Sequence, residues 1–141
     1  MQAKKNVLVG GCFDILHYGH IHFLKNAKRL GDFLVVALES DKNIKRLKGS
    51  GRPFHNQKKR KEILESLSFV DEVIILGPKM TDQNYKKMVQ RVGPSVIAVT
   101  QGDPVLAKKK AHAKLIGAKV VEVSKIKSPS TSQIAKILGV E

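Results

Sequence analysis

The sequence has 141 residues, and its 26 lysines and arginines against 12 aspartates and glutamates give a formal net charge of +14. This length predicts a single domain over residues 1–141, large enough to bury a core without disulfides. No apolar run approaches the ~18 residues of a membrane span, no export signal is recognisable near the start, and Cys12 is the only cysteine. We therefore expect a soluble, cytoplasmic protein.

The strong positive charge predicts a polyanionic partner, because such a field attracts and captures anions. Nucleic acid, nucleoside triphosphates and phosphorylated metabolites all satisfy this condition. The aromatic content of 5% and the lack of tryptophan argue against nucleic acid, as does the absence of a zinc-finger or aromatic RNA-binding signature. A basic nucleic-acid-binding module without catalysis is kept as the alternative of a different class.

The first third of the chain predicts two strands around one helix. A β-branched run covers residues 6–9, and the helix after it carries apolar residues on one face. Gly31 follows, where the end of a helix favours a left-handed residue. A second strand covers residues 33–38. The polar, basic segment 40–61 contains glycine and proline and is predicted to be a mobile loop.

The remaining two thirds repeat the alternation of helix and strand. Helices are predicted over residues 57–67, 85–92, 105–116 and 131–138, and strands over 72–76, 95–99 and 119–123. This alternation predicts the α/β class: a single Rossmann-like, doubly wound parallel sheet of about five strands with helices on both faces. Ligands of such sheets bind at the carboxyl ends of the strands, so the loops there should carry the chemistry.

One of these loops, residues 10–20, reads GGCFDILHYGH and leads from the first strand into the first helix. Glycines let backbone N–H groups approach a phosphate, and a helix N-terminus adds partial positive charge. His17 and His20 are three residues apart, so both imidazoles can face one bound anion, with Gly19 leaving space between them. Two histidines without a third ligand are a poor zinc set. The loop therefore predicts a phosphate site, and His22 is expected to be exposed.

The same loop resembles the TFDxxHxGH signature of the cytidylyltransferase-like nucleotidyltransferases. That group includes glycerol-3-phosphate cytidylyltransferases, heptose-phosphate adenylyltransferases and archaeal-type FAD synthases. The similarity continues through residues 27–32, 45–49, 52–53, Arg60 and 70–73. Residues 130–132 resemble the Ser-Thr end of the RTxGxST motif of these enzymes. Three positions depart from the family pattern: Cys12 replaces a threonine, Lys125 an arginine and Ser128 a glycine.

The resemblance implies an enzyme that transfers a nucleoside monophosphate from an NTP to a phosphorylated small molecule and releases pyrophosphate. The leading expectation is an adenylyltransferase that makes FAD from ATP and FMN, because single-domain relatives with a KxLKG loop include that group. Heptose-1-phosphate adenylyltransferase is an alternative, although its module is usually joined to a sugar kinase. Glycerol-3-phosphate cytidylyltransferase is another, although the C-terminal motif differs here. The choice between ATP and CTP is left open.

The resemblance also implies roles for individual residues. His17 and His20 would stabilise the reacting phosphates, with Lys48 or Lys45 near the α-phosphate. The residues expected to bind the nucleotide are Gly10, Gly11, Cys12, Phe13, His17, His20, Gly102, Asp103, Ser130, Thr131 and Ser132. Arg60, Lys125 and Arg52 would bind the triphosphate or the acceptor phosphate. Mg²⁺ is expected with the NTP, with Asp14 and Asp103 as weak ligands. A homodimer is also implied.

Overall fold

A computed structural model describes residues 4–127 and 129–139 of the chain. Its centre is a sheet of five strands in the order β3-β2-β1-β4-β5. The strands are β1 (Asn6–Gly11), β2 (Phe33–Leu38), β3 (Glu72–Ile75), β4 (Val96–Thr100) and β5 (Lys119–Val123). All four neighbouring pairs are parallel. Strands β2 and β3 thus lie on one side of β1, and strands β4 and β5 lie on the other side.

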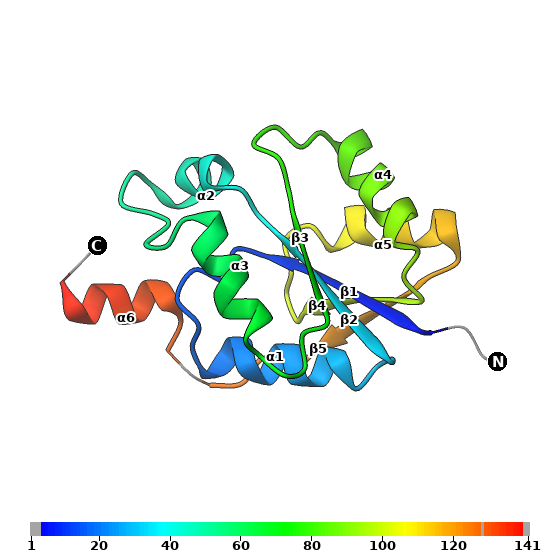
Figure 1. The fold of residues 1–141 in the computed structure, drawn as a ribbon, viewed down its shortest axis with the longest axis horizontal. Helices are drawn as coiled ribbons and strands as arrows, with labels where there is room; N and C mark the ends of the chain where they lie inside the picture. The colour runs from blue at the N-terminus through cyan, green and yellow to red at the C-terminus, as the bar shows by residue number, and fades with distance from the viewer. Residues whose placement is uncertain (1–3, 128, 140–141) are drawn as a thin grey trace.

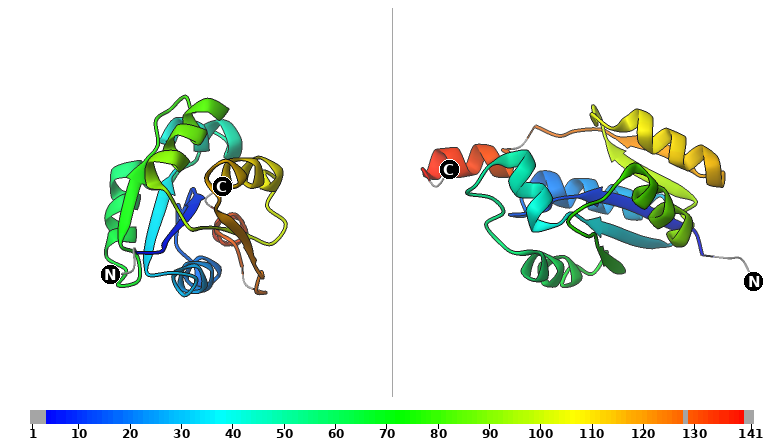
Figure 2. Two further views of the ribbon diagram at one scale, coloured as in Figure 1. Left: turned by 90° about the vertical axis from the view of Figure 1, so that its right-hand side faces the viewer. Right: turned by 90° about the horizontal axis from the view of Figure 1, so that it is seen from above.

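Six helices connect or follow the strands in the described residues, and they lie on both faces and at one end of the sheet (Figures 1 and 2). They are α1 (Tyr18–Lys28), α2 (Asp41–Lys48), α3 (Gln57–Glu65), α4 (Asp82–Val92), α5 (Leu106–Ile116) and α6 (Thr131–Leu138). Helices α1 and α3 cover one face, whereas α4 and α5 cover the other. Helices α2 and α6 lie toward the carboxyl end of the sheet.

Alternating strand residues divide the core into two apolar clusters. Val7 and Val9 point to the cluster beneath α1 and α3, and Leu8 points to the cluster beneath α4 and α5. Because both faces are covered, consecutive strand residues are buried, as in most parallel sheets. The fold predicted from the alternation of elements is confirmed.

The segment predicted as a mobile loop contains the helix α2, so this part of the prediction is wrong. Ser40 caps its N-terminus by accepting a hydrogen bond from the backbone N–H of Asn43 (3.1 Å). Ile44 is fully buried and anchors the helix to the rest of the molecule. The sequence did not show this helix clearly, because residues 42–48 are rich in lysine and only one side chain of the helix, Ile44, is buried.

Gly31 has a different role from the predicted one. The helix ends at Lys28 with a right-handed cap, and Gly31 is not among the described glycines with positive φ. A Cβ at Gly31 would instead come within 2.5 Å of the Lys5 carbonyl oxygen. Glycine is required here because the backbone passes close to the chain that enters β1.

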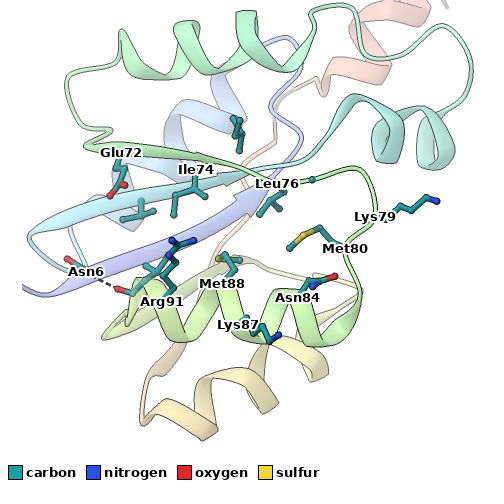
Figure 3. A pocket seen from close by; sticks show the side chains of 14 residues that line it. Asn6, Glu72, Ile74, Leu76, Lys79, Met80, Asn84, Lys87, Met88 and Arg91 are labelled. Carbon is teal, nitrogen blue, oxygen red and sulfur yellow. Dashed lines mark hydrogen bonds between the residues drawn. The ribbon is translucent and has the colours of Figure 1, made fainter.

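A groove of about 740 Å³ lies between β3 and α4 (Figure 3). Helix α4 connects β3 to β4 and therefore crosses over the middle of the sheet, which leaves the edge strand β3 only partly covered. Ile74, Leu76 and Met88 line the groove, and Lys87 and Arg91 lie along α4 beside it. None of the residues predicted for the site lines this groove.

Candidate active site

A second cavity, of about 550 Å³, lies where the strand order reverses between β1 and β4. The carboxyl ends of parallel strands diverge at such a switch point and leave room for a ligand. Many of the residues predicted from the sequence meet here: Gly10, Gly11, Cys12, Phe13, His17, His20, Lys48, Lys125 and Ser130. Gly19, which was predicted to leave space between the histidines, also lines the cavity.

His17 and His20 are locked together at the start of α1. His17 is the N-cap residue, and its Nδ1 accepts a hydrogen bond from the backbone N–H of Gly19 (3.0 Å). The Nδ1 of His20 accepts one from the backbone N–H of His17 (3.4 Å). Since Nδ1 is an acceptor in both rings, a neutral imidazole carries its proton on Nε2. The ring centroids are 3.9 Å apart and both residues line the cavity, so the two imidazoles lie side by side there.

Burial favours the neutral form of both imidazoles, because it lowers the pKa of each ring. Desolvation lowers the pKa of His17, and desolvation together with the neighbouring His17 and Lys48 lowers the pKa of His20 to about 4. Two protonated rings at this distance would repel each other, whereas two neutral rings do not. Neutral rings still offer hydrogen bonds to an anion, whose negative charge would favour protonation of the rings once it is bound.

The depressed pKa of His20 predicts how stability depends on pH. Below the ordinary value of 6.5 the unfolded chain takes up a proton that the folded protein resists until about pH 4. Stability should therefore decrease as pH falls from about 6.5 toward 4. Urea unfolding at pH 7 and pH 5 measures this loss, and a His20→Asn variant should lose less stability over the same interval. Equal losses in both proteins would contradict the assignment to His20.

Close approach explains the residues around the two histidines. A Cβ at Gly19 would lie 2.8 Å from the His17 ring, so glycine lets that ring fold back over the helix. Phe13 has a φ of 44°, in the left-handed region that side chains other than glycine rarely adopt. Its ring is buried and meets the His20 ring edge-on at 5.3 Å. The strained backbone of Phe13 thus supports the orientation of His20.

Asp14 and Arg52 form a buried ion pair next to the cavity. The Arg52 Nε donates to the Asp14 carboxylate at 3.0 Å, and both side chains are almost entirely buried. The backbone N–H groups of Phe54 and His55 also donate to this carboxylate. Burial alone would raise the pKa of Asp14, but these bonds and Arg52 outweigh it and lower the pKa. Asp14 therefore fixes the segment after α2, and its oxygens face protein donors.

Arg60 is also occupied inside the protein. Its side chain is fully buried and donates to the carbonyl oxygens of His55 (3.0 Å) and Cys12 (2.8 Å) and to Asp41 (2.7 Å). A phosphate contact was predicted for Arg60 and for Arg52, but all three side-chain nitrogens of Arg60 and two of the three of Arg52 already donate to protein groups. In the structure Arg60 instead holds the loop after β1 against α2 and α3.

The three hydroxyl residues at the start of α6 have separate contacts. Ser130 lines the cavity and caps α6 through the backbone N–H of Gln133 (3.2 Å). The Thr131 hydroxyl donates to the carbonyl oxygen of Ile15 (2.6 Å), and the Ser132 hydroxyl accepts from Arg52 (3.2 Å). Thr131 therefore ties α6 to the loop of the two histidines, Ser132 ties it to Arg52, and Ser130 is the one of the three that borders the cavity.

Other predicted residues lie outside the cavity lining. Lys45 is on α2 one turn before Lys48 and does not line it. Gly102 and Asp103 follow β4, and Asp103 bonds to Lys109 (2.6 Å) and to the backbone N–H of Val105 (2.8 Å). Ser128, where the family glycine was expected, lies outside the described residues.

Some residues that line the cavity were not singled out in the sequence. Thr100 ends β4, and Ser124 and Ile126 follow β5; folding brings them to the cavity because β4 pairs with β1 and β5 pairs with β4. Gln133 and His22 also line it, the latter against the expectation of a simply exposed side chain. A sequence signal existed for the first three, because each lies at the end of a predicted strand.

Within residues 4–127 and 129–139, no group of three or more histidine, cysteine, aspartate or glutamate side chains is arranged to hold a metal ion. Asp14 and Asp103, which were named as weak magnesium ligands, are engaged with Arg52 and Lys109. Among the same residues, no helix is long and apolar enough to cross a membrane.

Comparisons with known proteins agree with this geometry. The cytidylyltransferase-like family model matches residues 8–135. An FAD synthase from Thermococcus sibiricus is 38% identical over 97% of this chain and 92% of its own length. The bifunctional protein HldE from Helicobacter pylori is 47% identical over 67% of this chain, which spans 19% of that longer protein. The crystal structure of a lipopolysaccharide core biosynthesis protein from Thermoplasma volcanium superimposes with a TM-score of 0.71 at 30% identity, covering 89% of this chain and 99% of that one.

Proposed function

Because this chain belongs to the cytidylyltransferase-like family, we propose that it is a nucleotidyltransferase that uses ATP to adenylylate a phosphorylated small molecule. The observation that carries the proposal is the paired His17 and His20, whose Nδ1 atoms are tied to the backbone while both rings line the same cavity. Lys48 and Lys125 add positive charge to the same cavity. These groups suit a polyphosphate chain.

The reaction needs no nucleophile from the protein. An oxygen of the acceptor phosphate attacks the α-phosphorus of ATP, the bond from that phosphorus to the bridging oxygen of the β-phosphate breaks, and pyrophosphate leaves with the electron pair. The protein must hold the two substrates in line and neutralise charge that develops on the phosphates. His17 and His20 would donate hydrogen bonds to these oxygens, and Lys48 would lie beside the α-phosphate.

FMN is the acceptor that the similarities favour most, because the FAD synthase relative matches nearly the whole of both chains. The product would then be FAD. A sugar phosphate such as heptose 1-phosphate is the second candidate. It is favoured by the solved lipopolysaccharide core biosynthesis protein and by the higher identity to HldE over a shorter segment.

We further propose that Mg²⁺ arrives bound to the triphosphate. The carboxylates of Asp14 and Asp103 are bonded within the protein and do not fit a magnesium cage, so phosphate oxygens and water would hold the ion. A cytoplasmic location is proposed because both substrates are metabolites of that compartment. A homodimer is also proposed, because Ile75 on the edge strand β3 is largely exposed. Analytical sedimentation measures the oligomeric state.

Pyrophosphate release tests the proposed function. The protein is incubated with ATP or CTP and, in turn, with FMN, heptose 1-phosphate and glycerol 3-phosphate. We expect pyrophosphate and FAD from ATP with FMN. Release with another pair would reassign the substrate within the same reaction class. No release with any pair, together with salt-sensitive binding to generic DNA, would favour the basic nucleic-acid-binding module instead.

Lys48 and Lys45 provide a matched pair of variants on one helix. Lys48→Ala is expected to lower kcat/KM at least ~10-fold, because it removes a charge from the cavity that holds the phosphates. Lys45→Ala removes an equal charge one turn away, outside the lining, and should change kcat/KM less than ~3-fold. Steady-state pyrophosphate assays compare the two. Similar losses in both variants would mean that only the overall positive field matters.

A further inference from the structure

An acidic residue lies at the carboxyl edge of the sheet, beside a site built for anions. Glu39 directly follows β2, and its backbone N–H donates to the carbonyl oxygen of Gly11 (3.0 Å). It therefore lies next to the turn that leads to the two histidines. A carboxylate here would repel the phosphates of both proposed substrates, so its place beside the cavity calls for a physical reason.

The Glu39 carboxylate is held by side chains from two other elements. The Tyr85 hydroxyl on α4 donates to Oε1 at 2.6 Å, and the Asn43 side-chain amide on α2 donates to Oε2. Glu39 and Tyr85 are both only partly buried. A carboxylate has about four lone pairs, so two hydrogen bonds leave acceptor capacity free.

The position of Glu39 relative to Cys12 connects it to the cavity. Burial raises the pKa of the Cys12 thiol, and Glu39 raises it further while Lys48 opposes this effect. The pKa of Tyr85 is raised by burial and by Glu39, and Cys12 also acts on it. The geometry gives the same neighbourhood: Gly11, which accepts the hydrogen bond from the Glu39 backbone N–H, lines the cavity together with Cys12 and Lys48. Glu39 therefore follows β2 directly beside the cavity wall, although its own side chain is not among the lining residues.

The cavity extends to both sides of β1. Thr100, Ser124 and Ile126 line it from the ends of β4 and β5, whereas Lys48 lines it from α2, which follows β2. With the nucleotide on the side of β4, an acceptor that attacks the α-phosphorus near Lys48 would approach from the side of β2, where Glu39 follows the strand.

We propose that Glu39, held in place by Tyr85 and Asn43, is a specificity-determining residue that accepts hydrogen bonds from hydroxyl or N–H groups of the acceptor. The inference rests on the proposed function and deepens it. Acceptors that carry hydroxyls next to their phosphate gain a charge-assisted hydrogen bond. Acceptors with a second anionic group at this place are repelled.

The test separates acceptor binding from nucleotide binding. Glu39→Gln keeps the shape and an oxygen for Tyr85 but removes the charge. We expect it to weaken FMN binding at least ~10-fold, measured by quenching of flavin fluorescence, and to raise KM for FMN while KM for ATP changes less than ~2-fold. Glu72→Gln, an exposed carboxylate on β3, is the matched control and should change neither. Unchanged FMN binding in Glu39→Gln would overturn the inference.

A purely structural role for Glu39 makes a different prediction. If the carboxylate only ties α4 to β2, Tyr85→Phe and Glu39→Gln should lower the melting temperature equally and raise both KM values together. That result would also overturn the inference. If the wild type uses heptose 1-phosphate or glycerol 3-phosphate, its KM is compared in the same way, since both carry hydroxyls. A wild type that releases no pyrophosphate with any acceptor rejects the proposed function itself.

Discussion

Replacing His20 with asparagine is expected to lower turnover by ~10²-fold or more while the fold stays intact. The asparagine Oδ1 can replace the Nδ1 acceptor that His20 offers to the backbone N–H of His17. The Nε2–H donor, which would stabilise charge on the reacting phosphates, has no counterpart in asparagine. The same reasoning applies to His17→Asn, whose Oδ1 can still cap α1 through Gly19. Single-turnover pyrophosphate assays measure the loss.

Two controls identify the lost donor as the cause. His20→Gln places an amide near the position of Nε2 and should recover part of the activity that His20→Asn loses. His22→Ala removes a third imidazole, two residues further along α1, that lines the cavity but bonds to Asn26, and it should lower turnover far less than His20→Asn does. Near-normal turnover of His20→Asn would remove the assigned role of this ring.

Breaking the buried pair of Asp14 and Arg52 is expected to have the largest effect on stability. Asp14→Asn removes the charge that Arg52 faces and places an amide against the N–H groups of Phe54 and His55. Removing one partner of a buried ion pair costs about 3–5 kcal/mol, because the remaining charge is left uncompensated. Urea unfolding measures the loss. The activity should fall as well, because Arg52 also bonds to Ser132 at the start of α6.

A surface pair provides the comparison for Asp14. Lys61 and Glu65 are 3.7 Å apart on α3, and both side chains are exposed by more than a third. Glu65→Gln should therefore change stability by no more than about 0.5 kcal/mol. Should Asp14→Asn fail to fold, Arg52→Lys keeps the charge but loses the bond geometry, and an intermediate loss is expected. An unchanged unfolding midpoint in both variants would show that the pair contributes nothing.

The sequence by itself determined the succession of strands and helices along the chain and the position of the loop that carries His17 and His20. These features depend on neighbouring residues: β-branched runs between helical segments, and the spacing of His17, Gly19 and His20 at the start of a helix. It missed the helix α2, whose buried contact is limited to Ile44 among lysines. Local sequence patterns predict a helix or strand well where several of its side chains are buried together. They predict it poorly where, as in α2, a single buried side chain anchors the element.

Only the tertiary structure decided which charged residues face the cavity. Arg52 and Arg60 look alike in the sequence to Lys48 and Lys125, yet the two arginines are buried against Asp14, Asp41 and backbone carbonyls. Glu39 and Tyr85 are 46 residues apart and meet because α4 packs against the end of β2. Burial and pairing of charges depend on which distant segments fold together, and the sequence order of the residues carries no record of those distances.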